Sequence, residues 1–480
     1  MSVLSGVVFR RRFALNFYKN LSIPLAQMCF SKDFVNDNRG DMYPLLYKSE
    51  GASERIFGGD FILSGGRVER WAFSFFPYAS YKIKGECLSE GSFYGLSFTL
   101  GDGEKAEILV DTKKVYCKDK NLSLPSDIVL NNSNDGCALI ISARPGAFDI
   151  YFERPSGSIG YLGTVECEAF SRSLKYELFS SGYVSLCVSG DVRISSVKSY
   201  IDCGISQADI RPIRYENGEV MVEDGKIYLT VSVRVESGAF QGIFSLVPTT
   251  GDFNMTGAVF YDSGDGVWAN DVAASVLYDR ESERWRLWVP SFYHFHILGC
   301  SSFEGDIRFG VSVVDITLME RAEDGASVEE FKGFSGDEDP DFYYDKEKDK
   351  WYMAVCRLDK ESSAYRYMFF ESDSPHSGYK YIGKGFPGAE TGGSFVSVKG
   401  ERFFICGNSF SARSDYRIYS RDGMENARFD FPDGGFRGWG SLIPIKMGSR
   451  TRYFWLTFDR HKGSDYNWSY GNIYCFEGDI

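Results

Sequence analysis

VLYDRESERWRLW, from Val276 to Trp288, and FYYDKEKDKWYMA, from Phe342 to Ala354, share one pattern: Tyr-Asp, a charged turn, and then Trp. Each segment alternates apolar and polar residues around that turn, which predicts a β-hairpin. Two copies of one hairpin at different points of the chain indicate a repeated supersecondary unit. We therefore expect a fold in which several such units stack around a shared core.

Three further segments repeat the order of apolar strand, polar turn and aromatic strand. They are VMVEDGKIYLTVSV from Val220, FVSVKGERFFICGNS from Phe395 and LIPIKMGSRTRYFWLTF from Leu442. Five copies between residues 203 and 480 leave about 50–65 residues for each, enough for a four-stranded propeller blade. The pattern predicts a five-bladed β-propeller over residues 203–480, in which Asp279 and Asp345 are turn residues.

Residues 55–200 contain short alternating strands separated by Gly, Asp and Asn, as in YGLSFTLGDGEKAEILVD and CALIISARPGAFDIYFE. Regular short strands with turn signals are typical of a β-sandwich. We expect residues 1–202 to form an accessory β-sandwich of lectin or jelly-roll type, with the first 50 residues as an arm or an edge of it. The expected fold class is therefore all-β.

Charge and cysteine content exclude several classes of function. The formal net charge of -13 and the lack of a basic cluster argue against nucleic acid or an anionic membrane as a partner. Eleven cysteines without a CxxC pair indicate neither a zinc site nor a disulfide framework. Cys356, Cys406 and Cys475 lie within apolar strands, so we expect them to be buried thiols. Such thiols favour a reducing compartment, and the opening residues do not resemble a signal peptide.

Polar residues at the start of each blade's first strand are expected to converge on the central channel. The five segments are ADIRPI with Asp209 and Arg211, VWANDVAAS with Trp268 and Asp271, DEDPDF with Asp339, AETGGSF with Glu390, and GWGSLIP with Trp439. Crowded carboxyl groups raise one another's pKa, so that one stays protonated while another is ionised. Glycoside hydrolysis requires such a pair, because one group protonates the leaving oxygen and the other activates water or attacks the sugar.

Residues near these acids are expected to have roles other than catalysis. Glu338 should lie on the opposite face of its strand from Asp339, because side chains alternate along a strand. The two histidines of FYHFHILG share a strand face but lack further ligands, so no metal is expected. Substrate-binding roles are expected for Arg211, Trp268, Asp271, His294, Trp439 and His461, the tryptophans by stacking on a sugar ring.

The same segments resemble glycoside hydrolase family 43 and related five-bladed propeller glycosidases, in a divergent form. ADIRPI resembles the family's first-blade Ala-Asp-Pro segment, GVWANDV its second-blade Trp-Ala-Pro-Asp segment, and DPDFYYDKEKDKWYM its third-blade Asp-Pro run. ETGGSFVSVKGERFFICGNS and GWGSLIPI resemble the Glu-Gly and Gly-His-Gly-Ser segments of the fourth and fifth blades.

The resemblance implies that Asp209 is the general base, that Asp339 orients and tunes the acid, and that Glu390 is the general acid. It implies hydrolysis with inversion, without an organic cofactor, of a pentose-containing plant oligosaccharide or polysaccharide, from the chain end. It also favours a periplasmic or secreted location, against the thiol content.

Two alternatives stay open. One is a carbohydrate-binding propeller without catalysis, which is expected if any of the three acids points away from the channel. The other is a retaining fructan-type hydrolase on the same fold. Carboxyl groups about 5–5.5 Å apart would indicate retention, and groups about 6.5–9.5 Å apart inversion.

Overall fold

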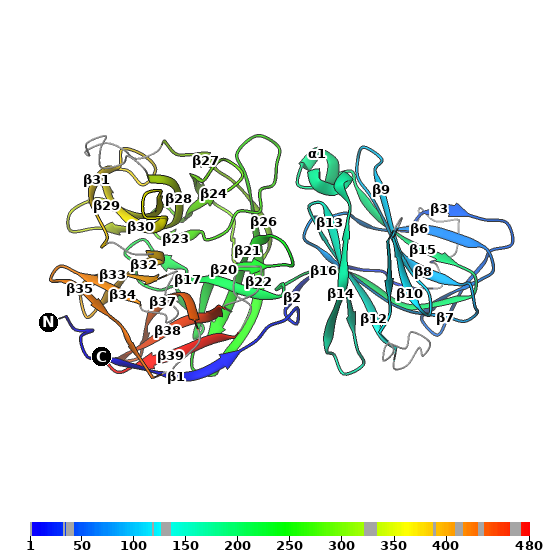
Figure 1. Ribbon diagram of the computed structural model, residues 1–480, viewed down its shortest axis with the longest axis horizontal. Coiled ribbons are helices and arrows are strands. Elements are labelled where there is room, and N and C mark those ends of the chain that lie inside the picture. Colours follow the sequence, from blue (N-terminus) through cyan, green and yellow to red (C-terminus); the bar gives the residue numbers. More distant parts are fainter. Residues whose placement is uncertain are drawn as a thin grey trace. The chain divides into compact units, whose positions relative to one another are not determined.

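The chain forms two compact units, built almost entirely from β-strands (Figure 1). The first unit contains residues 22–202, and the second contains residues 1–21 and 203–480. In the computed structural model, the described residues are 2–31, 34, 43–117, 120–125, 136–320, 334–386, 390–408, 416–430, 436–460 and 472–480. Within these residues, no helix has the length and apolar character needed to cross a bilayer. The expectation of an all-β chain is confirmed.

Residues 22–202 form two antiparallel sheets. In order across the first sheet, the strands are β11 (Lys120–Ser123), β10 (Lys114–Cys117), β9 (Lys105–Val110), β8 (Phe93–Thr99), β15 (Tyr183–Ser189), β6 (Arg67–Ser74) and β3 (Leu45–Lys48). The second has β14 (Ile159–Glu166), β13 (Ala147–Glu153), β12 (Ala138–Arg144), β7 (Ser80–Cys87), β16 (Val192–Asp202), β5 (Asp60–Ser64) and β4 (Ser53–Phe57), and β2 (Ser22–Gln27) also pairs with β16.

The two sheets pack against each other through aromatic side chains. Phe98 on β8 lies with its ring centroid 5.2 Å from that of Tyr81 on β7 and 4.6 Å from that of Phe148 on β13. All three side chains are fully buried. Two antiparallel sheets packed face to face make this unit a β-sandwich.

The second unit contains five sheets, and each is one blade of a propeller. Blade I has β17 (Ser206–Pro212), β20 (Lys226–Arg234), β21 (Ala239–Val247), β22 (Asp252–Asp262) and β26 (Gly310–Asp315), with β19 (Val222–Glu223) on β20. Blade II has β18 (Arg214–Tyr215), β23 (Ser275–Asp279), β24 (Arg284–Ser291), β25 (Ile297–Phe303) and β27 (Thr317–Leu318). Blade III has β28 (Phe334–Asp345), β29 (Lys350–Asp359), β30 (Ala364–Ser372) and β31 (Lys380–Lys384). Blade IV has β32 (Glu390–Val398), β33 (Glu401–Asn408), β34 (Arg417–Ser420) and β35 (Gly423–Asn426).

Blade V combines both ends of the chain. It contains β37 (Phe436–Met447), β38 (Arg450–Arg460), β39 (Ile473–Gly478), β1 (Val8–Leu15) and β36 (Arg428–Phe429). Figure 1 shows β1, in blue, beside β39, in red, and the two strands pair antiparallel from Arg10 with Glu477 to Leu15 with Ile473. Residues 1–21 were expected in the sandwich. They belong instead to the propeller, because β1 supplies backbone hydrogen-bond partners that β39 would otherwise lack.

The first strands of the blades form a closed ring. β28 contacts β23 and β32, β37 contacts β32 and β17, and β18, which follows β17, pairs with β23. The five-bladed propeller predicted from the repeat is therefore confirmed. Its start lies at residue 203, but its last blade needs the N-terminal strand.

The repeated Tyr-Asp motif lies at the hairpin turns, as predicted. The Asp279 carboxylate accepts hydrogen bonds from the backbone N–H groups of Glu281 at 3.1 Å and Ser282 at 3.3 Å. Asp345 accepts one from the Glu347 N–H at 3.2 Å. Each carboxylate thus satisfies backbone donors of its turn, which explains why the repeat keeps Asp at this point.

The thiol prediction is also confirmed. All eleven cysteines are free, and Cys356, Cys406 and Cys475 are fully buried in strands of blades III, IV and V.

Candidate active site

Asp209 and Asp339 occupy matching positions on the first strands of blades I and III. Each lies in a β-bulge, where the register shifts between Ala208 and Arg211 in one strand and between Glu338 and Asp341 in the other. Each also has a left-handed backbone, with φ of 49° at Asp209 and 45° at Asp339. A left-handed non-glycine residue in a strand is strained, and such strain is concentrated at functional sites.

The Asp339 carboxylate, on blade III, is held by contacts from two other blades. From blade IV, the Thr391 hydroxyl and the Gly392 backbone N–H, the latter at 2.9 Å, both donate to Oδ2. From blade I, the guanidinium of Arg211 lies 3.7 Å from Oδ1. This carboxylate is therefore fixed in position, as a group that orients others must be.

Asp209 is buried and paired with Arg234, whose Nη2 donates to its Oδ2 at 3.4 Å. Burial raises the pKa of Asp209, the charge of Asp339 raises it further, and Arg234 opposes both. Arg211, two residues after Asp209 on the same strand, reaches the Asp339 carboxylate, so the strand that carries Asp209 lies beside that acid. A carboxylate with a raised pKa is a stronger base than an ordinary one, which suits the extraction of a proton from water.

Arg211 lies on the same strand as Asp209, but its guanidinium contacts Asp339 on blade III. Its Nη1 donates to the Pro340 carbonyl oxygen, and its Nη2 is the group beside Asp339. The hydrogen-bond partner of Asp209 is Arg234 from β20, and the expected contact of Arg211 with substrate stays a prediction. Arg211 is fully buried.

Blade II contributes Asp271, which precedes β23. One of its oxygens accepts the Phe292 backbone N–H at 2.8 Å, and the other has no hydrogen-bond partner among the described residues. Burial raises the pKa of Asp271 to about 6. This oxygen is buried as well as unpaired, and the predicted contact of Asp271 with substrate stays a prediction.

His294 and Trp268 also lie on blade II. His294 is held on both ring nitrogens, since Nδ1 lies 2.8 Å from the Ser291 hydroxyl and Nε2 lies 3.3 Å from the Asp265 carboxylate. Trp268 is partly exposed. Both positions are compatible with the expected contacts to a sugar, which stay a prediction.

Glu390 does not take the position expected of a general acid. Its side chain has no exposed surface, and its Oε1 accepts hydrogen bonds from the Tyr419 hydroxyl and, at 2.8 Å, from Arg417 Nη1. Its Oε2 accepts the Tyr367 N–H at 3.3 Å, and a side chain at Gly385 would collide with that oxygen. The donors come from third strands of blades III and IV, away from the first strands that line the ring. Among the described residues these donors enclose both oxygens of the carboxyl, and the predicted role of Glu390 as general acid stays a prediction.

Glu338 was expected to face away from Asp339 and to lie outside the pocket, because side chains alternate along a strand, but this reason does not hold in the structure. Its register shifts on both sides, after Ser335 and before Asp341, so the ordinary alternation of side chains does not hold there. Burial raises the pKa of Glu338 to about 7, with further contributions from the charges of Asp339 and Asp209. Glu338 therefore belongs to the same acidic cluster.

Two expected residues fall outside this description. Trp439 lies in β37, between Gly438 and Ser441 where the register again shifts, but only its backbone is described. His461 lies outside the described residues. Their predicted roles stay predictions.

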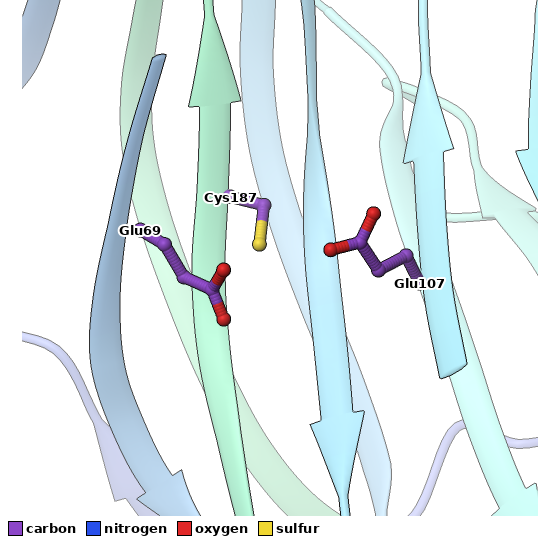
Figure 2. A group of neighbouring side chains, drawn as sticks. All are labelled: Glu69, Glu107 and Cys187. Carbon is purple, nitrogen blue, oxygen red and sulfur yellow. The ribbon is translucent and has the colours of Figure 1, made fainter. Parts of the chain in front are cut away.

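The sandwich contains another group of potential ligand atoms, shown in Figure 2, where Glu69, Glu107 and Cys187 point toward one another from β6, β9 and β15. The Lys105 ammonium lies 3.1 Å from both carboxylates, and Arg67 lies 2.8 Å from that of Glu107. Burial raises the pKa of the Cys187 thiol to about 12, so it stays protonated at neutral pH. We interpret this group as an ion-pair network on the sheet.

Comparison with known proteins gives matches only among solved structures. No family model and no curated protein matches the chain. A β-1,3-galactosidase of glycoside hydrolase family 43 has 13% sequence identity and a TM-score of 0.38, covering 55% of this chain and 93% of that one. An α-L-arabinofuranosidase from Podospora anserina has 10% identity and a TM-score of 0.39, covering 57% and 91%. An α-L-arabinofuranosidase from Lactobacillus brevis has 13% identity and a TM-score of 0.39, covering 56% and 90%.

All three are glycosidases, the class of protein that the sequence motifs resemble. The identities are too low for an activity or a residue's role to be transferred from them. The class of this chain's larger unit, a five-bladed β-propeller, rests on its own five sheets.

Proposed function

We propose that this protein is a glycosidase that hydrolyses an oligosaccharide or polysaccharide at the acidic cluster of its propeller. The observation that carries the proposal is the pair Asp209 and Asp339, each strained into a left-handed bulge at the same point of two different blades. A strained backbone persists only where surrounding structure enforces it, and here it presents two carboxylates to one site. No organic cofactor is needed for this chemistry.

The two carboxylates have different roles in the proposal. Asp209, with its raised pKa, accepts a proton from the attacking water, which gives inversion at the anomeric carbon. Asp339, fixed by Thr391 and Gly392, orients the neighbouring acid and the sugar. Asp271 fixes the turn after β24 by accepting the Phe292 N–H. The finer substrate, a pentose-containing plant glycan cut from its end, is supported by the sequence resemblance alone.

The test is release of reducing sugar from a panel of pentose, hexose and uronic-acid aryl glycosides and plant oligosaccharides. The wild type is expected to act on at least one of them, and Asp209→Asn to lower kcat about 100-fold or more. Asp345→Asn, which alters a turn carboxylate, is the matched control and is expected to keep activity. Equal activity in Asp209→Asn and wild type would overturn the assigned base.

A second candidate function, carbohydrate binding without hydrolysis, is favoured by one observation, the sealed position of Glu390. If no other group donates the proton, the site binds a glycan but does not cleave it. Wild-type protein that hydrolyses nothing in the panel, yet binds plant oligosaccharides with an affinity that Asp271→Ala weakens, would establish this function instead.

We also propose that the sandwich is an accessory unit that binds carbohydrate. Its support is a pocket of about 600 Å³ lined by Leu25, Ala26, Gln27, Tyr43, Trp71, Ala72, Phe73, Ser74, Phe75, Phe76, Tyr81 and Ser199. Aromatic walls pack well on the C–H faces of sugars. In the full chain, Trp71→Ala is expected to weaken binding to polysaccharide while hydrolysis of small aryl glycosides stays unchanged; unchanged polysaccharide binding would reject this role.

A further inference from the structure

Glu338 lies in the acidic cluster in a strained part of β28. Two register shifts flank it, and two left-handed residues, Gly336 with φ of 69° and Asp339 with φ of 45°, stand on either side. Between these two shifts, Glu338 is the only residue of β28 that pairs with β29, opposite Cys356. The backbone is therefore bent at both ends of a very short segment whose central side chain is Glu338.

Two side chains contact one oxygen of Glu338, one from blade III and one from blade II. The Tyr365 hydroxyl on β30 donates to Oε1 at 3.2 Å, and His296 Nδ1 from the turn after β24 lies 2.9 Å from the same oxygen. Among the described residues, no hydrogen bond is made to Oε2. One oxygen is thus positioned by the protein, and the other is left for a ligand.

Exposure separates Glu338 from the other acid expected here. The Glu338 side chain is 20% exposed, whereas that of Glu390 is 0% exposed. Glu390 is held by three hydrogen bonds from Arg417, Tyr419 and Tyr367. A group that transfers a proton to a substrate must touch it, so Glu338 satisfies the geometric requirement and Glu390 does not.

We propose that Glu338 is the proton donor of the glycosidase reaction, held by Tyr365 and His296, and that Glu390 is a positioning residue inside the blade. This inference rests on the proposed function. Glu338 gives its carboxyl proton to the glycosidic oxygen while the bond from that oxygen to the anomeric carbon breaks. Water attacks the anomeric carbon and passes a proton to Asp209. The products are a sugar hemiacetal and an alcohol, and exchange with solvent returns the proton from Asp209 to Glu338.

The electrostatics of the cluster agree with this role. Burial first, and then the negative charge of Asp339, raise the pKa of Glu338 to about 7, while the hydrogen bond from Tyr365 lowers it. Burial lowers the pKa of His296, so its imidazole is neutral at pH 7 and does not favour ionisation of Glu338. Asp209 from blade I adds a further raising charge. An acid with a pKa near 7 is still about half protonated at neutral pH and transfers its proton readily.

The charged residue that precedes Glu338 on the same strand is already neutralised. Asp337 accepts a hydrogen bond from Arg357 Nε at 2.6 Å, and both side chains are buried. The backbone N–H of Asp337 donates to the His296 carbonyl at 2.8 Å, which ties the blade II turn to β28. His296 is therefore held beside Glu338 by its backbone, while its Nδ1 approaches Oε1 to 2.9 Å without a hydrogen bond.

The test compares Glu338→Gln with Glu390→Gln on two substrates of the same sugar. One substrate has an activated aryl leaving group that departs without protonation, and the other is an oligosaccharide whose leaving group needs a proton. Glu338→Gln is expected to lower kcat/KM at least about 100-fold on the oligosaccharide and much less on the activated glycoside. Glu390→Gln is expected to affect both substrates by the same factor, whatever that factor is.

The pH profile provides a second measurement. The wild-type rate on the oligosaccharide is expected to fall above pH 7 as Glu338 loses its proton, and this alkaline limb should disappear in Glu338→Gln. Tyr365→Phe removes a donor to the ionised form, so the alkaline limb is expected to move to higher pH. This variant keeps the carboxyl group and the ring, so it tests the assignment even if Glu338→Gln folds poorly.

The outcomes separate the two proposals. Equal losses on both substrates in Glu338→Gln, or a selective loss on the oligosaccharide in Glu390→Gln, would overturn the donor assignment and leave a glycosidase. A wild type that hydrolyses nothing in the panel would overturn the glycosidase proposal, and the donor assignment with it.

Discussion

Asp209 and Asp339 share one backbone conformation, left-handed with φ within a few degrees of each other, although they lie in blades that are separated in the ring by blade II. In each strand the next residue but one, Arg211 or Asp341, returns to the ladder and is buried. The same backbone bend thus recurs in several blades, and the residue at the bend is not always Asp. At the matching point of blade IV the bend is made by Gly392, with φ of 59°.

This strain predicts an unusual order of stability. At Asp209, replacement by glycine is expected to give a protein about 1 kcal/mol more stable than replacement by alanine, because only glycine adopts positive φ without strain. Both variants lose the same carboxylate and its bond to Arg234, so their difference isolates the backbone. Urea unfolding of Asp209→Gly and Asp209→Ala measures it.

The control for that comparison is Asp279, on β23, whose φ is not positive. There the order should reverse, with alanine more stable than glycine by about 0.5–1 kcal/mol. If alanine is more stable than glycine at both positions, the bend at Asp209 is not strained.

The buried acid of blade II predicts a pH dependence of stability. The pKa of Asp271 rises from 3.8 to about 6 on folding, mainly by burial. Its contribution to stability is therefore fully present below pH 4 and is lost as the pH rises through 6. Asp271→Asn does not titrate, and its amide oxygen can still accept the Phe292 N–H. The stability of the variant relative to wild type should increase by up to about 3 kcal/mol between pH 4 and pH 7.

Chemical unfolding of both proteins at several pH values measures this difference, in which titrations of other groups cancel. A constant difference across the range would mean that Asp271 has an ordinary pKa in the folded protein.

A substitution in the N-terminal strand β1, far from the acidic cluster, is expected to cause a large loss of stability. Phe9 on β1 is 1% exposed, and its ring centroid lies 5.0 Å from that of Trp455 and 5.5 Å from that of Phe429 in blade V. Phe9→Ala is expected to lower the free energy of unfolding by about 3–5 kcal/mol, as for other buried Phe to Ala changes. Val8→Ala, at a 40% exposed neighbour, should cost less than about 1 kcal/mol. Similar losses from both would argue that β1 is not required to close the ring.

How far the sequence predicts this fold depends on how far apart along the chain the interacting residues lie. The propeller was found because each hairpin, such as the one containing Asp279, has its strands and turn within about 15 residues, where periodicity and turn chemistry are readable. The pairing of β1 with β39 joins opposite ends of the chain, and no local pattern in residues 8–15 indicates which strand they join. The N-terminal segment was therefore assigned to the wrong unit.

The candidate site was predictable in part for the same reason. Asp209 and Asp339 lie in recognisable strand segments, so both were predicted. Glu338 was rejected by the alternation rule, because the bulges that break this rule leave no clear signal beyond an Asp before Pro340. The burial of Glu390 depends on Arg417 and Tyr419, which lie in a third strand, so nothing near Glu390 in the sequence predicts it.

The turn between β24 and β25 predicts where a longer substrate binds. Phe295 at its tip is 91% exposed and left-handed, with φ of 56°. The turn is nevertheless fixed, since Asp271 holds its start through the Phe292 N–H and Asp337 holds its end through the His296 carbonyl. An exposed aromatic ring on a fixed turn that reaches Glu338 through the next residue, His296, is suited to stack on a sugar unit.

Phe295→Ala is therefore expected to lower kcat/KM for oligosaccharides about 3–10-fold, the size of one aromatic contact, and to leave small aryl glycosides unchanged, because they do not extend to the turn. Phe309→Ala is the matched control: its ring is 52% exposed but packs beside Tyr228 on blade I. Kinetics on oligosaccharides of increasing length measure the effect. If Phe295→Ala and Phe309→Ala behave alike at every length, the turn does not bind substrate, and its strained conformation requires another explanation.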